Sequence, residues 1–286
     1  MPEILTTADD LRAALAAGHF PDGGPVRVLD VRWRLDRPDG RPEYRTGHIP
    51  GAQYVDLDRE LAGHGAPTEG RHPLPDVAAL QESARRWGVD DGDTVVVYDD
   101  LRNLSSARAW WLLRYAGVAD VRLLDGALRA WTDAGFGVET GDAAEPTTGS
   151  VTLTYGALPV LPLEEVAAFA DHALLLDARA GERYRGEAEP IDPRAGHVPG
   201  AVSAPTTENV ADDGRFRAPG ELRERFAALG AVPGAEVGVY CGSGVTAAHQ
   251  AVALTLAGFR PRVFPGSWSQ WSNHPALPVA TGPEPR

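Results

Sequence analysis

Residues Val237–Gly258 read VGVYCGSGVTAAHQAVALTLAG, and a strand pattern changes into a helix pattern inside this stretch. Val237 to Tyr240 is short, apolar and rich in β-branched valine, which predicts a buried strand. Beyond it, apolar side chains recur at helical spacing until a glycine ends the helix: Val245, Ala248, Val252, Leu256 and Gly258. Cys241, the only cysteine of the chain, therefore lies between the carboxyl end of a strand and the amino end of a helix.

The position of Cys241 predicts a reactive thiol. Gly242 and Gly244 let the backbone curl tightly, so that several N–H groups can point at the sulfur while the helix dipole adds positive potential. Both effects favour the thiolate over the thiol. A lone cysteine is more often a small buried hydrophobe, but glycines around a strand-to-helix turn describe an anion cradle better than a packed core. We predict that Cys241 is the nucleophile and that Gly242, Gly244, Val245 and Thr246 form the cradle that binds the substrate.

The composition limits the possible partners and cofactors. The chain has 286 residues, 43% of them hydrophobic, which suits two packed domains. A formal charge of −13 and an isoelectric point near 5.0 argue against nucleic acid or an anionic membrane as partner, so an anionic substrate must be met by local arginines. One cysteine excludes an internal disulfide and a zinc site built on several thiolates, and we expect neither a metal nor an organic cofactor. The acidic, amphipathic start and the lack of a membrane-length apolar run predict a cytoplasmic protein.

The second half of the sequence repeats the first at a displacement of about 140 to 150 residues. LDVR at 29–32 recurs as LDAR at 176–179, and GHIPGA at 47–52 recurs as GHVPGA at 196–201. Residues 139–150 between the copies are polar and rich in small side chains, which is typical of a linker. We predict a first domain over residues 1–138, a linker over 139–155 and a second domain over 156–286.

Each copy alternates short apolar strands with amphipathic helices such as Val77 to Trp87 and Glu221 to Leu229. The predicted strands are Val26 to Val31, Thr94 to Tyr98 and Val121 to Leu124 in the first copy, and Leu174 to Asp177, Val237 to Tyr240 and Arg262 to Phe264 in the second. This alternation predicts an α/β fold with a parallel sheet and helices on both faces in each copy. Ligands of such folds bind at the carboxyl ends of the strands, where Cys241 stands.

These segments resemble the tandem-domain sulfurtransferases, the family of rhodanese and 3-mercaptopyruvate sulfurtransferase. The resemblance covers nearly the whole chain and rests on the two repeated segments, the loop CGSGVTA at 241–247 and PGSWSQW at 265–271. It implies two tandem rhodanese-like domains, the first of them non-catalytic because Asp99 stands where the second has Cys241. It also implies that Cys241 takes a sulfane sulfur from a small-molecule donor, becomes a persulfide, and passes the outer sulfur to cyanide or to a thiol acceptor such as a thioredoxin-like protein.

The mercaptopyruvate branch of that family suggests further site residues. Two arginines hold the substrate carboxylate there, and Arg183 and Arg194 resemble them, although Arg194 lies closer to the GHVPGA segment than its counterpart does. An Asp–His–Ser relay activates the substrate in that branch, and Asp56, His72 and Ser243 resemble its members. Because Asp56 and His72 come from the first copy, the resemblance implies an active site at a domain interface.

Several other polar and aromatic residues are interpreted as structural. His48 and His197 recur at equivalent turns in both copies, including the copy without a nucleophile, so we expect them to anchor loops. Trp268 and Trp271 have a counterpart in Trp131 and are expected in the core. Asp99 precedes a predicted helix, where a carboxylate is favourable for structural reasons alone.

Three classes of function compete for the sequence. A cysteine phosphatase or arsenate reductase needs an arginine six residues after the cysteine, and that residue is Ala247 here, which argues against this class. A sulfur-carrier or regulatory binding protein fits the first copy, whereas the second copy combines nucleophile, cradle and arginines. Among sulfurtransferases, the neutral pair Gly242 and Ser243 favours 3-mercaptopyruvate as the donor. Thiosulfate, whose two negative charges suit a basic loop, stays as the alternative.

Overall fold

The computed structural model describes residues 3–285, and the chain divides into two compact units. The first unit comprises the chain up to Ala62 together with Pro75–Ala157 and Asp212–Arg215. The second unit comprises Gly63–Leu74, Leu158–Ala211 and the chain from Phe216 onward. The boundaries predicted from the sequence do not include this exchange of segments, which places His72 in the same unit as Cys241.

The first unit contains a five-stranded parallel sheet in the order β1-β5-β4-β2-β3. Its strands are β1 (Leu5–Thr6), β2 (Val26–Asp30), β3 (Gln53–Tyr54), β4 (Thr94–Tyr98) and β5 (Asp120–Leu124). Its helices are α1 (Ala8–Ala17), α2 (Arg41–Thr46), α3 (Leu57–Glu60), α4 (Val77–Arg86), α5 (Ser106–Tyr115) and α6 (Ala127–Asp133).

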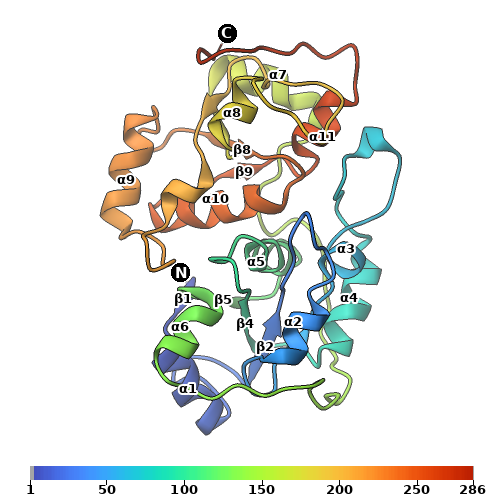
Figure 1. Cartoon of the computed structure of the whole chain (residues 1–286), viewed down its shortest axis with the longest axis vertical. Coiled ribbons are helices and arrows are strands. Elements are labelled where there is room, and N and C mark those ends of the chain that lie inside the picture. The colour runs from blue at the N-terminus through green and yellow to red at the C-terminus, as the bar shows by residue number, and fades with distance from the viewer. Residues whose placement is uncertain (1–2, 286) are drawn as a thin grey trace. The chain divides into compact units, whose positions relative to one another are not determined.

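Both faces of this sheet are covered by helices. Val96 and Tyr98 of β4 pack in one apolar cluster with Leu11 of α1 and Trp131 of α6. Figure 1 shows α1 and α6 side by side. Since side chains alternate along a strand, Val97 points to the opposite face, which α5 covers by packing on β4 and β5. The strand is therefore apolar at successive positions, as a doubly covered parallel sheet requires.

The second unit contains a four-stranded parallel sheet in the order β7-β6-β8-β9. Its strands are β6 (Leu174–Asp177), β7 (Val202–Ser203), β8 (Val237–Tyr240) and β9 (Arg262–Val263). Its helices are α7 (Leu163–His172), α8 (Gly181–Tyr184), α9 (Pro219–Ala228), α10 (Val245–Leu256) and α11 (Ser267–Ser272), with the short 3-10 helices η1 (Pro67–Glu69) and η2 (Thr206–Asn209).

Helices also cover both faces of the second sheet. In Figure 1, α10 lies on one side of β8 and β9, and α7 lies on the other. On the α7 side, Tyr240 packs in one cluster with Phe169 of α7 and with Trp268 and Trp271 of α11. The predicted α/β fold with doubly covered parallel sheets is confirmed in both units.

The structural elements around the cysteine follow the sequence prediction closely. Strand β8 spans Val237–Tyr240, and helix α10 spans Val245–Leu256. Gly258, which was predicted to stop this helix, has a φ of +94°, a left-handed value that favours glycine. Cys241 therefore stands at the carboxyl end of a strand in the middle of the second sheet.

Candidate active site

The backbone of Cys241 is fixed by hydrogen bonds to the segment that follows β9. The Cys241 N–H donates to the Oγ of Ser267 over 3.1 Å, and the Trp268 N–H donates to the Cys241 carbonyl over 2.9 Å. The neighbouring Ser269 N–H donates to the Gly242 carbonyl over 2.8 Å. The cysteine itself is 1% exposed. The segment PGSWSQW thus holds the nucleophile loop in place.

The predicted cradle lies at the amino end of α10. The Gly244 N–H donates to the Sγ of Cys241 over 3.1 Å, and the Ser267 Oγ lies 3.9 Å from the same sulfur. Gly244 is the N-cap of α10 and has a φ of +81°, so a glycine suits this turn. Val245 and Thr246 begin the helix, where backbone N–H groups have no acceptor within the helix. This end of α10 is suited to a second, negatively charged sulfur attached to Cys241.

Two of the three predicted relay residues are adjacent. The Nδ1 of His72 lies 2.7 Å from the Oγ of Ser243, and both residues are 6% exposed. The imidazole accepts the hydroxyl proton in one tautomer and donates its own in the other, so the pair can move a proton in either direction. Ser243 lies two residues along the chain from the nucleophile.

Asp56, the third predicted relay residue, belongs to the first unit. It is the N-cap of α3, where its Oδ1 accepts the Arg59 N–H over 3.2 Å and its own N–H donates to Glu60 over 2.8 Å. It also lines a pocket of about 550 Å³ with Arg41 and Trp87. These contacts are local, and the membership of Asp56 in the relay stays a prediction.

Arg183 lies next to the nucleophile loop, as predicted. A methyl group placed on Gly242 would lie 3.2 Å from the Nη1 of Arg183. The other side of this guanidinium is held by carboxylates: Nη2 lies 2.6 Å from Glu189 and 3.2 Å from Asp192. These ion pairs therefore hold the guanidinium group of Arg183 close to Gly242.

Arg194, predicted as the second substrate arginine, has a different set of partners. Its guanidinium donates to four backbone carbonyls at the end of α11 and just beyond it, over 2.7 to 2.9 Å: Trp271, Ser272, His274 and Leu277. Carbonyls at the end of a helix lack partners within the helix, and a cation there also complements the helix dipole. In this structure Arg194 caps the end of α11, and its role in holding the substrate carboxylate stays a prediction.

Arg71, which the sequence analysis did not single out, also lies next to the nucleophile loop. The same methyl group on Gly242 would lie 3.5 Å from the Nη2 of Arg71. The Nη1 of Arg71 donates to Asp192 over 2.8 Å. Sequence reasoning missed Arg71, Asp192 and Ser267, because the contacts that reveal them join segments far apart in the chain.

Behind the loop, the arginines belong to a partly buried ion-pair network with balanced charge. Three arginines and three carboxylates take part: Arg71, Arg179, Arg183, Asp177, Glu189 and Asp192. The Glu189 and Asp192 side chains are each 3% exposed. Burial lowers the pKa of Arg179, but its partner Asp177 raises it more, and the balance lies above the ordinary arginine value. The network presents N–H donors to the loop without a large net charge.

The two repeated histidines fit their structural interpretation. The Nδ1 of His48 lies 3.1 Å from the Tyr44 carbonyl, and the ring stacks on Tyr44. The Nδ1 of His197 lies 2.8 Å from the Tyr184 carbonyl, and the ring stacks on Tyr184. Each histidine thus ties the GHIPGA or GHVPGA turn to the helix before it.

Asp99 fills the corresponding loop of the first unit with its own carboxylate. It is fully buried and accepts backbone N–H groups from Leu101, Asn103, Ser105 and Ser106 over 2.7 to 3.0 Å. The hydroxyls of Ser105 and Ser106 add two further contacts. This arrangement stabilises the loop and fits the structural interpretation of Asp99.

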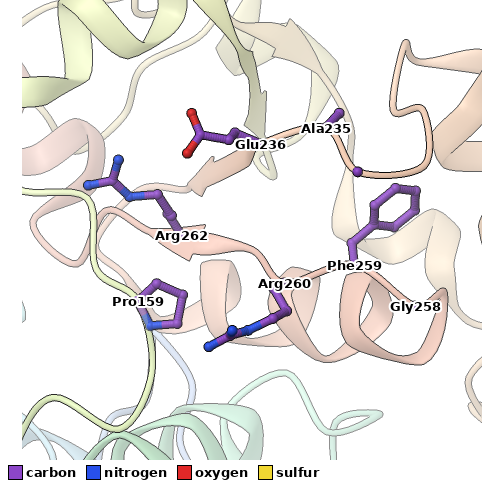
Figure 2. Close-up of a pocket in the computed structure, with 8 residues that line it drawn as sticks. Pro159, Ala235, Glu236, Gly258, Phe259, Arg260 and Arg262 are labelled. Atoms are coloured by element: carbon purple, nitrogen blue, oxygen red, sulfur yellow. The ribbon is translucent and has the colours of Figure 1, made fainter.

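A separate pocket of about 440 Å³ lies in the second unit and is shown in Figure 2. It is lined by Glu236, which directly precedes β8, by Phe259 after α10, and by Arg260 and Arg262. Arg262 is already bound to the Val160 carbonyl over 3.1 Å. Since Cys241 follows the carboxyl end of β8, this pocket at the amino end is not the site of the thiol chemistry.

Within residues 3–285, no group of three or more His, Cys, Asp or Glu side chains is placed to hold a metal ion. Over the same residues, no helix is long and apolar enough to cross a membrane.

Comparison with known proteins defines the class to which this fold and this loop belong. Residues 7–134 and 163–274 both match the family model of the rhodanese-like domain. The chain therefore belongs to the rhodanese-like domain family, and it is a sulfurtransferase with two such domains.

Its relatives cover the chain almost completely. It is 48% identical to the putative thiosulfate sulfurtransferase SseB of Mycobacterium tuberculosis over 98% of each chain. It is 45% identical to the probable 3-mercaptopyruvate sulfurtransferase of Pseudomonas aeruginosa over 97% of this chain and 98% of the other. The crystal structure of SseA from Escherichia coli, a 3-mercaptopyruvate sulfotransferase with the rhodanese fold, aligns with a TM-score of 0.80 and 31% identity, covering 93% of this chain and 99% of SseA.

Proposed function

We propose that the protein transfers sulfur from 3-mercaptopyruvate, through a persulfide on Cys241, to a thiol or to cyanide. The observation that carries the choice of donor is the 2.7 Å contact between His72 and Ser243 beside the nucleophile. Cleavage of a carbon–sulfur bond needs a proton on the carbon that leaves, and a hydroxyl–imidazole pair can deliver one. Thiosulfate releases sulfite when its sulfur–sulfur bond breaks, and that step needs no proton donor.

The proposed half-reaction balances without an external reagent. The Cys241 thiolate attacks the donor sulfur, a sulfur–sulfur bond forms, and the carbon–sulfur bond breaks with its electron pair passing to the carbon. Ser243 and His72 carry the proton of the donor thiol to that carbon, which gives pyruvate and the Cys241 persulfide. The amino end of α10 stabilises the charge on the outer sulfur, and a second thiolate then attacks this sulfur and releases the enzyme.

The charge around the loop supports the same donor. Gly242 and Ser243 add no charge, and the arginines near Gly242 are paired with the buried carboxylates Glu189 and Asp192. A single planar carboxylate can use the remaining N–H donors, whereas a dianion would meet little net positive charge.

Thiosulfate is the second candidate donor, and a specific observation favours it. SseB of Mycobacterium tuberculosis, named a putative thiosulfate sulfurtransferase, is 48% identical over 98% of this chain. The probable 3-mercaptopyruvate sulfurtransferase of Pseudomonas aeruginosa is 45% identical over a similar share. Overall similarity therefore does not separate the two donors, and the local chemistry of the loop must do so.

The proposal extends to the acceptor and the location. We propose a thiol acceptor of the thioredoxin-like kind, because the chain has a single cysteine and so cannot resolve its own persulfide with a second thiol. A cytoplasmic location is consistent with that reducing chemistry. The formal charge of −13 supports partners other than nucleic acid and anionic membranes.

A donor comparison on the purified protein tests the proposal. We expect kcat/KM for 3-mercaptopyruvate to exceed that for thiosulfate by about tenfold or more, with pyruvate released in step with sulfur transfer. A preference for thiosulfate under the same acceptor concentration would overturn the choice of donor while leaving the persulfide chemistry in place.

A further inference from the structure

Two arginine side chains of the second unit point N–H groups at Gly242, the residue that follows the nucleophile. A methyl group on Gly242 would lie 3.2 Å from the Nη1 of Arg183 and 3.5 Å from the Nη2 of Arg71. Within residues 3–285, neither nitrogen makes a hydrogen bond, although the other nitrogens of Arg183 bind carboxylates. The Nε of Arg71 is buried and also lacks a partner among these residues. One nitrogen of each guanidinium group that makes no hydrogen bond within these residues therefore lies next to Gly242.

The position of Arg71 is set by its backbone. Its N–H donates to the Oγ of Ser269 over 3.0 Å, and the Ser269 N–H donates to the Gly242 carbonyl over 2.8 Å. Gly70, with a φ of +92°, lets the chain pass so close to Gly266 that an added methyl group would lie 2.9 Å from the Gly266 carbonyl oxygen. One serine thus ties Arg71 to the nucleophile loop at fixed spacing.

Asp192 forms an ion pair with both arginines through nitrogens other than the two nearest to Gly242. Its Oδ1 accepts from Arg71 over 2.8 Å, and its Oδ2 accepts from Arg183 over 3.2 Å. Its side chain is 3% exposed, so the carboxylate is held rigidly and its charge is poorly screened by solvent. It fixes both guanidinium groups, and together with Glu189 it offsets their two charges.

We propose that Arg71 and Arg183 together bind the carboxylate of the sulfur donor, and that Asp192 is the positioning residue that aims both guanidinium groups at residue 242. Arg71 thereby takes the role that sequence analysis gave to Arg194. The identity of the donor rests on the proposed function, whereas the anion site itself does not. Two guanidinium groups offer N–H donors to a planar carboxylate, and Asp192 and Glu189 behind them leave little net positive charge to favour a dianion.

The first test measures how nearby charges affect the reaction of Cys241 with an anionic reagent, and it needs no sulfur donor. Cys241 is the only thiol, so its alkylation by iodoacetate, an anion, and by neutral iodoacetamide can be followed by intact mass. In Arg71→Gln the ratio of the two rates should fall about fivefold or more, because an attracting charge is lost. In Asp192→Asn the ratio should rise.

The matched control is Arg185→Ala. Arg185 is two residues from Arg183 and also pairs with a carboxylate, Glu187, over 2.7 Å, but that pair lies on the surface. The alkylation ratio should stay at the wild-type value in this variant. A fall in Arg185→Ala equal to that in Arg71→Gln, or no fall in Arg71→Gln, overturns the anion site whichever donor the enzyme prefers.

The second test separates binding from positioning. Arg71→Gln should raise KM for 3-mercaptopyruvate about tenfold or more with a small change in kcat, since a charge-assisted contact to the donor is lost. Asp192→Asn should improve kcat/KM for thiosulfate relative to 3-mercaptopyruvate, because one offsetting charge is removed. If Asp192 had only a structural role, Asp192→Asn would lower kcat/KM for both donors by the same factor. That outcome counts against the proposal.

Protein that misfolds is recognised by its melting temperature, and Arg71→Lys then serves in place of Arg71→Gln. Lysine keeps the charge but not the planar fork, so the alkylation ratio should stay close to wild type while KM rises. A lysine variant with wild-type KM would show that the fork of Arg71 does not hold the donor.

Discussion

The side chains of Asp99 in the first unit and Cys241 in the second stand at equivalent positions, and each accepts a backbone hydrogen bond from the start of the next helix. Each follows a fully buried tyrosine that ends a strand. The N-cap residue of the next helix donates its N–H to the side chain in both: Ser105 to Asp99 over 2.9 Å, and Gly244 to Cys241 over 3.1 Å. The first unit therefore places a permanent carboxylate where the second places a sulfur, which indicates that this helix end is built to hold an anion in both units.

Replacing Asp99 should alter stability and leave catalysis unaffected. In Asp99→Asn, the NH2 group of asparagine replaces one carboxylate oxygen and cannot accept the N–H groups that this oxygen accepts in the wild type. We therefore expect a loss of about 2 kcal/mol or more in the free energy of unfolding. Turnover per folded molecule should be unchanged. Urea unfolding and donor kinetics check the two expectations, with Asp133→Asn, an exposed aspartate, as the control. A large loss of kcat in the folded variant would give Asp99 a functional role.

The persulfide should form on Cys241 and nowhere else. Wild-type protein treated with a donor should gain one sulfur by intact mass, and Cys241→Ser should gain none, because serine cannot form the sulfur–sulfur bond. The side chain of Cys241 is buried and nearly isosteric with serine, so the melting temperature should change little. Sulfur transfer that survives in Cys241→Ser would contradict the mechanism.

The fold was predictable because both copies carry strong local signals. The bounds of β4, β6 and β8 match the predicted strands, since valine- and leucine-rich runs covered on both faces leave no competing pattern. The strands β1, β3 and β7 span two residues each and escaped prediction, whereas β9, also two residues long, was predicted one residue longer, from Arg262 to Phe264. So short a segment gives little periodicity to detect.

The site was predictable only where residues are neighbours in the chain or match a family motif. Cys241, Ser243 and Gly244 form one loop, and the loop has the expected geometry. Arg71 lies 121 residues from Asp192 along the chain, and a contact of that kind leaves no trace in spacing or composition. The same limit applies to Arg194: its resemblance to a substrate arginine of the family gives no sign of its four carbonyl partners, which lie at least 77 residues away.

Gly244 should resist substitution because of its backbone conformation. Its φ of +81° lies in the left-handed region, where a side chain costs about 1 to 2 kcal/mol. Gly244→Ala should therefore lose stability by about that amount and also lower the rate of persulfide formation, as its N–H no longer meets the sulfur. Gly220→Ala is the control, because Gly220 lies in the first turn of α9 with no atom within 4 Å of an added methyl group. Equal persulfide rates in both variants would show that the Gly244 N–H does not assist the reaction.

Arg194 should prove a stability residue. Removing its side chain in Arg194→Ala takes four hydrogen bonds from carbonyls at and beyond the end of α11, of which those of Trp271 and His274 keep a backbone donor. We expect a loss of about 2 kcal/mol or more in the free energy of unfolding. Molecules that remain folded should keep the wild-type KM for 3-mercaptopyruvate. A rise in KM without a loss of stability would instead restore Arg194 as a substrate residue.

The pair of Ser243 and His72 should matter for one donor and not for the other. Ser243→Ala removes the hydroxyl that lies 2.7 Å from His72, and kcat for 3-mercaptopyruvate should fall about 100-fold or more because the leaving carbon loses its proton source. Turnover of thiosulfate should change by less than about threefold, since no proton is needed in that cleavage. His72→Asn is the matched variant: its amide can still hydrogen-bond to Ser243 near the position of Nδ1 but cannot take up a proton, so it should resemble Ser243→Ala in rate. Pyruvate release and sulfite release, measured at equal persulfide yield, separate the two donors. An equal loss for both donors would mean that the pair only shapes the loop, and the relay would then have to be abandoned.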